Sequence, residues 1–117
     1  MSRTVNVFLL LLFPWLAIAQ NKPVVQVTDA DIGPGQNVFW SSANVYLLNG
    51  FVFVEENATL TIEAGTVIKG KPGQGENASA LIIARGGKIF AEGTPTNPII
   101  FTAESDDVTR LDDLPLD

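Results

Sequence analysis

Apolar and polar residues alternate along residues 59–68 (TLTIEAGTVI). Leu60 and Ile62 are flanked by Thr59, Thr61 and Glu63. This is the two-residue period of a strand that has one face in a core and the other in water. A glycine turn then leads into a second short apolar run, so the ten residues predict a strand, a turn and another strand.

A diverged copy of this unit follows 29 residues later. Placing residues 52–54 over 81–83 aligns two apolar pairs and a glutamate: Leu60 with Ile89, Ile62 with Ala91, and Glu63 with Glu92. After a one-residue gap, the Gly-Thr pair at 65–66 falls on the Gly-Thr pair at 93–94. Repetition of a strand-turn-strand unit at about 20 to 50 residues predicts a solenoid, in which each coil buries its apolar face against the next.

Further short runs of β-forming residues, separated by turn residues, lie at 24–28, 38–40, 45–48, 51–54, 81–83 and 99–101. Asn49-Gly50 fits either a type I′ hairpin turn or a solenoid corner, and the near-continuous apolar runs around it favour the corner. Left-handed backbone is expected at four corner residues: Asn57, Gly65, Gly86 and Gly93. Residues 70–79, rich in glycine, predict a loop that bulges from one coil.

These features predict an all-β fold, a right-handed parallel β-helix (solenoid) with incomplete N-terminal coils, preceded by a helical signal peptide. The predicted divisions are a signal peptide (1–19), a leader and N-terminal cap strand (20–37), β-helix coils (38–103) and an acidic, turn-rich end of a truncated chain (104–117). At most two copies of the unit are recognised, whereas stacked repeats generally need about three. The sequence therefore predicts the N-terminal piece of a longer protein, whose missing C-terminal coils cover its last strand.

The first 19 residues have the three parts of a secretory signal peptide. Arg3 supplies the positive start, residues 5–13 the apolar run, and the Ala-Ile-Ala sequence at 17–19 the cleavage site. An uncleaved anchor is the alternative, but the apolar run is shorter than the ~20 residues that span a bilayer, and Pro14 interrupts it. We therefore expect cleavage after Ala19, a secreted or cell-surface protein and no stable membrane span.

Composition excludes several kinds of site. The 117 residues carry a net charge of -6 with scattered basic residues, so nucleic acid is not an expected partner. The chain has no cysteine and no histidine, which removes disulfides, thiolate ligands, imidazole bases and His-ligated zinc. No catalytic, cofactor-binding or metal-binding residue is assigned, and no cofactor is expected.

Carboxylates are the most numerous candidate groups for chemistry: Glu55, Glu56, Glu63, Glu92, Glu104, Asp106 and Asp107. A pair of them could cleave a glycan by acid-base catalysis, but charge on the outer face of a strand ordinarily keeps a sheet soluble. The acidic end could bind calcium through Glu104, Asp106, Asp107, Asp112 and Asp113. It lacks the spacing of known calcium loops, and a solvated linker is the favoured interpretation.

Aromatic and basic residues offer two further binding hypotheses. Phe39, Trp40 and Tyr46 could stack on sugar rings, although aromatic residues near the first coil more often plug its open core. The basic residues of the repeat region could contact an acidic glycan, but scattered positive charges are more often plain surface: Lys69, Lys71, Arg85 and Lys88. The two N-x-Ser/Thr sequences, at Asn57 and Asn77, are read as turn asparagines.

Five segments carry a resemblance to a known group of proteins: 27–31, 51–56, 60–70, 84–89 and 97–102. They are similar to secreted Bacteroidetes-type right-handed parallel β-helix proteins, which often have a C-terminal type IX sorting domain. The resemblance covers residues ~24–107 and implies the fold, export and further coils. With it, we expect an exported noncatalytic scaffold that works in adhesion or in contact with an extracellular glycan or surface partner. The alternative is the N-terminal part of a polysaccharide lyase or hydrolase whose active coils lie beyond residue 117.

Overall fold

The computed structural model describes residues 22–108, and within that range the chain is built from short strands. The strands are β1 (Val24–Val27), β2 (Asn37–Trp40), β3 (Val45–Leu48), β4 (Phe51–Val54), β5 (Thr59–Ile62), β6 (Val67–Gly70), β7 (Ala80–Ile83), β8 (Lys88–Ala91) and β9 (Ile100–Ala103). Two 3-10 turns, η1 (Asp29–Asp31) and η2 (Gly75–Asn77), lie between them. The predicted signal peptide and the acidic residues Asp112 and Asp113 lie outside the described residues.

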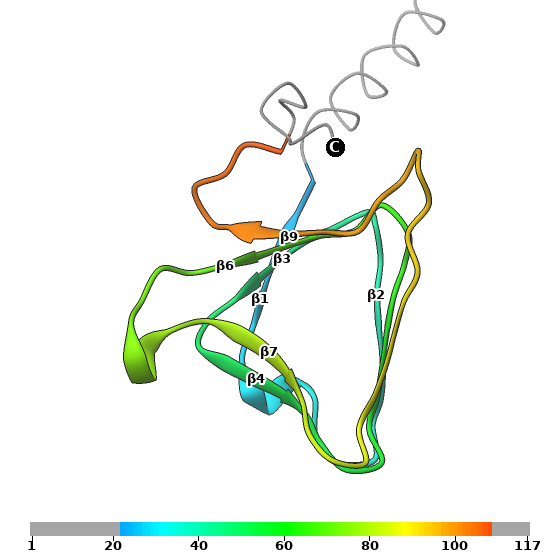
Figure 1. The fold of residues 1–117 in the computed structure, drawn as a ribbon, viewed down its shortest axis with the longest axis vertical. Coiled ribbons are helices and arrows are strands. Elements are labelled where there is room, and N and C mark those ends of the chain that lie inside the picture. Colours follow the sequence, from blue (N-terminus) through cyan, green and yellow to red (C-terminus); the bar gives the residue numbers. More distant parts are fainter. Residues whose placement is uncertain (1–21, 109–117) are drawn as a thin grey trace, which may run out of the picture.

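The strands form three parallel sheets that share one axis. The sheets have the orders β1-β3-β6-β9, β2-β5-β8 and β4-β7, and each pairing within them is parallel. Figure 1 shows the successive coils as stacked triangles, with one sheet on each side. Consecutive strands along the chain thus belong to different sheets, and each strand pairs with the strand one coil away. This is the parallel β-helix that the sequence predicts.

The strand register confirms the 29-residue repeat. Leu60 lies opposite Ile89, and Ile62 lies opposite Ala91. An earlier repeat went unrecognised in the sequence comparison, because β2 pairs with β5 at a spacing of 22 residues, for example Val38 with Leu60. The stack also begins earlier, since β1 pairs with β3. The described chain therefore holds more stacked units than the two counted in the sequence.

The predicted corners are confirmed except at the end of the second copy. Backbone φ is positive at Asn57 (64°), Gly65 (87°) and Gly86 (84°). Gly50 (φ 87°) is a corner, because it joins β3 to β4 in another sheet. The loop predicted at 70–79 is present and contains η2.

The predicted match of Gly65-Thr66 with Gly93-Thr94 is wrong. Ile100 N donates to Thr66 O at 3.0 Å, and the side chain of Asn97 lies over Gly65. Extra residues between β8 and β9 form a turn in which Thr94 N donates to Asn97 O at 3.1 Å. Gly93 lies in this excursion rather than at the corner, and it is not among the described glycines with positive φ.

The core lies inside the triangle and consists of every second residue of the strands. Leu60, Val52 and Val54 have no exposed surface. Trp40 and Tyr46 stack inside the first coils with ring centroids 4.8 Å apart. Tyr46 Oη accepts a hydrogen bond from Ser41 N at 2.8 Å, so the polar end of this buried ring is satisfied.

The two ends of the described stack are different. At the N-terminal end, η1 contacts β4, and Ile32, only 1% exposed, fills the core beside it; Val25 on β1 remains 37% exposed. At the C-terminal end, Phe101 on β9 is 52% exposed and Ile83 on β7 is 37% exposed, although both belong to inward-facing columns. The core is therefore closed beside β4 and uncovered at the last coil.

Candidate functional site

The outer face of the β2-β5-β8 sheet carries two exposed phenylalanine rings. Phe39, Thr61 and Phe90 occupy equivalent positions on the three strands, and we call these three residues the aromatic row. Their neighbours along each strand point into the core, so the row points outward. The side chains of Phe39 and Phe90 are 59% and 52% exposed. With strands ~4.8 Å apart, the two rings stand on backbone positions about 10 Å apart.

A second outward row lies two residues earlier on the same strands. It contains Asn37, Thr59 and Lys88, which are paired in register. A hollow of about 130 Å³ opens where β5 and β8 begin, and it is lined by Asn57, Ala58, Thr59, Gly86 and Lys88. Polar side chains and a small recess therefore adjoin the aromatic row on the side where the strands start.

Glu63 lies on the other side of the aromatic row, directly after β5. Its Oε1 accepts hydrogen bonds from Ser42 N at 2.8 Å, from Ser42 Oγ at 2.9 Å and from Ser41 Oγ at 3.4 Å. The backbone N–H of Ser42 is the main cause that lowers the pKa of Glu63 below its ordinary value of 4.5, with the Ser42 hydroxyl next. A carboxylate held ionised is suited to fixing the turn of the preceding coil, and not to donating a proton at neutral pH.

The remaining candidate carboxylates are spread over the described coils. Asp106 Oδ2 accepts a hydrogen bond from Thr102 Oγ1 at 2.7 Å, and its backbone carbonyl accepts one from Lys69 Nζ, also at 2.7 Å. These contacts hold the segment after β9 against the outer face of its sheet. Among residues 22–108, no three acidic side chains come together in a way that could hold a metal ion.

The structure divides the predicted aromatic group. Trp40 and Tyr46 are 3% and 6% exposed and fill the core, as the plug hypothesis predicts. Phe39 does not, because it alternates with Trp40 along β2 and faces outward. Of the predicted basic residues, Lys88 lies in the outward row beside the aromatic row, and Arg85 is exposed at the corner before β8.

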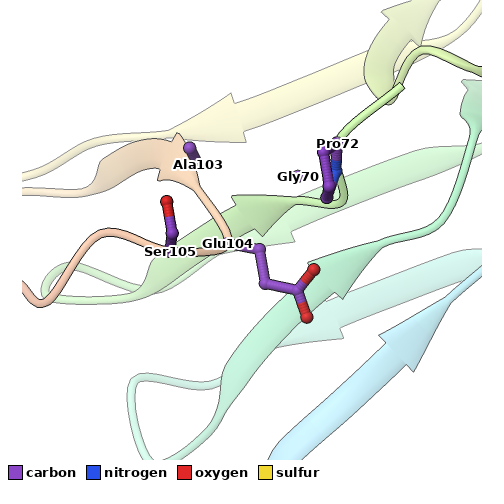
Figure 2. Close-up of a pocket in the computed structure, with 5 residues that line it drawn as sticks. All are labelled: Gly70, Pro72, Ala103, Glu104 and Ser105. Carbon is purple, nitrogen blue, oxygen red and sulfur yellow. The ribbon is translucent and has the colours of Figure 1, made fainter. Parts of the chain in front are cut away.

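Another hollow lies where β6 and β9 end. It has a volume of about 210 Å³ and is lined by Gly70, Pro72, Ala103, Glu104 and Ser105. In Figure 2, Pro72 stands on one side and the three residues after β9 on the other. Pockets that enclose small molecules usually measure about 300–1,000 Å³, so this hollow is too small and open to serve as an enclosed ligand pocket.

Residues 33–112 match the family described as "Pectate-lyase like beta helix domain". The chain belongs to this family. The match agrees with the three parallel sheets and with the prediction of a β-helix protein. No curated protein and no solved structure matches the chain. Within the described part of this pectate-lyase-like domain, no helix is long and apolar enough to cross a membrane.

Sequence reasoning missed the aromatic row, although the necessary signal was present. Leu60 and Ile62 are predicted inward, which places Thr61 outward. The residue 22 positions before Thr61 is Phe39, and the residue 29 positions after it is Phe90. With the earlier repeat recognised, the strand pattern alone would have placed both rings on the outer face of this pectate-lyase-like domain.

Proposed function

We propose that this chain forms the first coils of an exported, noncatalytic β-helical scaffold. In this proposal it belongs to a larger cell-surface or secreted protein of the Bacteroidetes type, and its outer faces contact an extracellular glycan or surface partner. The observation that carries the proposal is the difference between the two ends of the stack. The end beside β4 is closed by η1 and Ile32, whereas core residues of the last coil are exposed to solvent.

The exposed core at the last coil favours a continuation of the stack. Phe101 stands in the same inward column as Tyr46 and Ile68, yet half of its surface faces water. One more coil would bury this ring and pair the free edge of β9, and uncovered sheet edges are generally protected in native proteins. The same coil would cover Ile83 at the end of β7.

Export rests on residues 1–19. A positive start, a short apolar run and a small-residue cleavage site are the features of a signal peptide. Removal of this segment would leave Gln20 as the first residue of the mature protein and leave no span in the membrane.

An enzyme is the second candidate function, because the family description itself names a pectate lyase. In that case the chain would supply the first coils of a polysaccharide lyase or hydrolase, and the catalytic residues would lie on other coils. The acidic side chains described here support the scaffold instead, since Glu63 is engaged with the preceding coil and the others are spread over several corners.

One experiment separates the two candidates. The native protein is purified from culture medium or cell surface with an antibody against residues 22–108, then analysed for N-terminal sequence, mass and release of oligosaccharides from polygalacturonate. The scaffold proposal expects an N-terminus at Gln20, a mass above the 12.5 kDa of these 117 residues, and no release. Depolymerisation of the polymer would overturn the noncatalytic proposal and support the enzyme.

A further inference from the structure

We propose that the aromatic row, formed by Phe39, Thr61 and Phe90, binds a neutral, extended polysaccharide that lies along the coil axis. This inference deepens the proposed function, on whose glycan contact it rests, by assigning the site and the class of ligand. It starts from the placement of two exposed rings on the same outward row of neighbouring coils.

The spacing of the two rings suits a sugar chain. Phe39 and Phe90 are separated by one strand, β5, and two strand spacings amount to about 10 Å. This is close to the length of two sugar units in an extended β-linked chain. Alternate sugar rings could therefore rest their apolar C–H faces on the two phenyl rings, a contact that buries apolar surface on both partners.

Polar groups stand where a bound sugar would present its hydroxyls. The Thr61 side chain, half-buried, lies between the two rings and can both donate and accept hydrogen bonds. Thr59 and Lys88 line the small hollow beside the row, where a hydroxyl group at the edge of the chain would have space. Apolar faces with polar groups between them are the pattern that sugar-binding surfaces require.

The charge of the chain favours a neutral glycan over a uronate polymer. The net charge is -6, so a polyanion would be repelled over the whole approach. Glu63, with its pKa lowered chiefly by the backbone N–H of Ser42, keeps a negative charge at the end of β5. Lys88 is the single positive residue of the neighbouring outward row, which is too little to offset this field.

A protein partner or a second copy of the chain fits the row less well. Protein interfaces bury a continuous apolar centre within about 1,200–2,000 Å². Here a threonine separates the two rings, and the adjoining outward row is polar: Asn37, Thr59 and Lys88. The row is long and narrow, running across the strands in the direction of the coil axis, and this shape matches a single linear chain.

Calorimetric titration of the mature chain, residues 20–117, with cellohexaose tests the proposal. Phe39→Ala and Phe90→Ala are each expected to weaken binding about tenfold, as the loss of one stacking contact implies. Phe51→Ala is the matched control, because Phe51 is also exposed (40%) but lies on β4 in another sheet; its binding should equal that of the unchanged chain. Hexagalacturonate should bind more weakly than cellohexaose.

Several results would overturn the site. These are no binding of cellohexaose, equal weakening by Phe51→Ala, tighter binding of hexagalacturonate, or a dimer in sedimentation that Phe39→Ala abolishes. Circular dichroism checks that each variant is folded, and Phe39→Leu and Phe90→Leu, which keep apolar bulk without a ring face, replace any alanine variant that is not. Absence of binding would leave the scaffold function standing, whereas cleavage of a polymer by the native protein would overturn the scaffold and leave the row to be judged by these variants.

Discussion

Asp29 replaces a missing strand beside Phe53. Asp29 Oδ1 accepts a hydrogen bond from the backbone N–H of Phe53 at 2.9 Å, at the edge of β4 where the first coil has the turn η1 instead of a strand. An edge N–H that would otherwise face water or another chain is therefore paired within the molecule. This contact is one reason why the N-terminal end of the stack is closed.

The Asp29 contact predicts a measurable stability difference. Asp29→Ala removes the acceptor and should lower the free energy of unfolding by about 1 kcal/mol, the usual net value of one hydrogen bond. Asp29→Asn keeps an acceptor oxygen and should lose less. Urea unfolding followed by circular dichroism measures both variants, and equal losses would contradict the role given to the side-chain oxygen.

Glu63 predicts a pH dependence of stability. Its folded-state pKa lies below 4.5, first because of the backbone N–H of Ser42 and then because of the Ser42 hydroxyl. A lowered pKa means that the stabilisation is fully present above the unfolded value and is lost as pH falls through the folded value. The urea midpoint should therefore decrease as pH falls below about 4.5.

Glu63→Gln is the control for that pH dependence. The amide does not ionise, so the variant should show a shallower decrease in the urea midpoint between pH 4.5 and more acidic values. At neutral pH it should be less stable than the unchanged chain, because a neutral acceptor forms weaker hydrogen bonds with Ser41 and Ser42. Parallel pH profiles for the two proteins would argue that other carboxylates cause the acid sensitivity.

Neighbouring residues of β5 should respond in opposite ways to a negative charge. Leu60 has no exposed surface and lies between Val38 and Ile89 in the core, so Leu60→Asp should cost more than about 4 kcal/mol and prevent folding. Thr61 faces outward, and Thr61→Asp should cost only about 1 kcal/mol, the range of strand propensity. Thermal unfolding compares them; similar effects would contradict the assigned facing.

Gly87 is predicted to tolerate no side chain. A Cβ atom there would fall onto the backbone carbonyl oxygen of Val54 on the coil below. Gly87→Ala should therefore destabilise the fold by about 1–3 kcal/mol, as overpacking does. Gly35→Ala is the contrasting variant, since its added Cβ meets open space and only its positive φ of 75° opposes the change. The urea midpoints should rank Gly87→Ala below Gly35→Ala.

The alternation of β5 was enough to predict much of the fold. Leu60 and Ile62 recur as Ile89 and Ala91, and side chains that repeat at a constant spacing along parallel strands must share one inward column. The structure places these residues in register. The spacing failed between β8 and β9, where a longer excursion carries Gly93 away from Gly65, because corner length is not constrained by the strand period.

The outer face was harder to predict than the core. Phe39 was grouped with Trp40 and Tyr46 by residue type, although neighbouring positions on one strand face opposite sides. Its exposure followed only from the 22-residue spacing between β2 and β5, which the diverged sequence of the first coil conceals. The closed end was equally hidden, since the bond from Phe53 to Asp29 joins residues with no pattern in common.

The corner between β4 and β5 takes left-handed backbone at Asn57, and the corner one coil later takes it at Gly86. Asn57 N donates to Gly86 O at 3.0 Å, so the two corners are joined directly. An engineer who wished to lengthen the solenoid by grafting a new rung onto it would accordingly have to keep glycine or asparagine in this place. The rest of that rung could then be chosen freely, provided that it alternates between oily and water-loving residues.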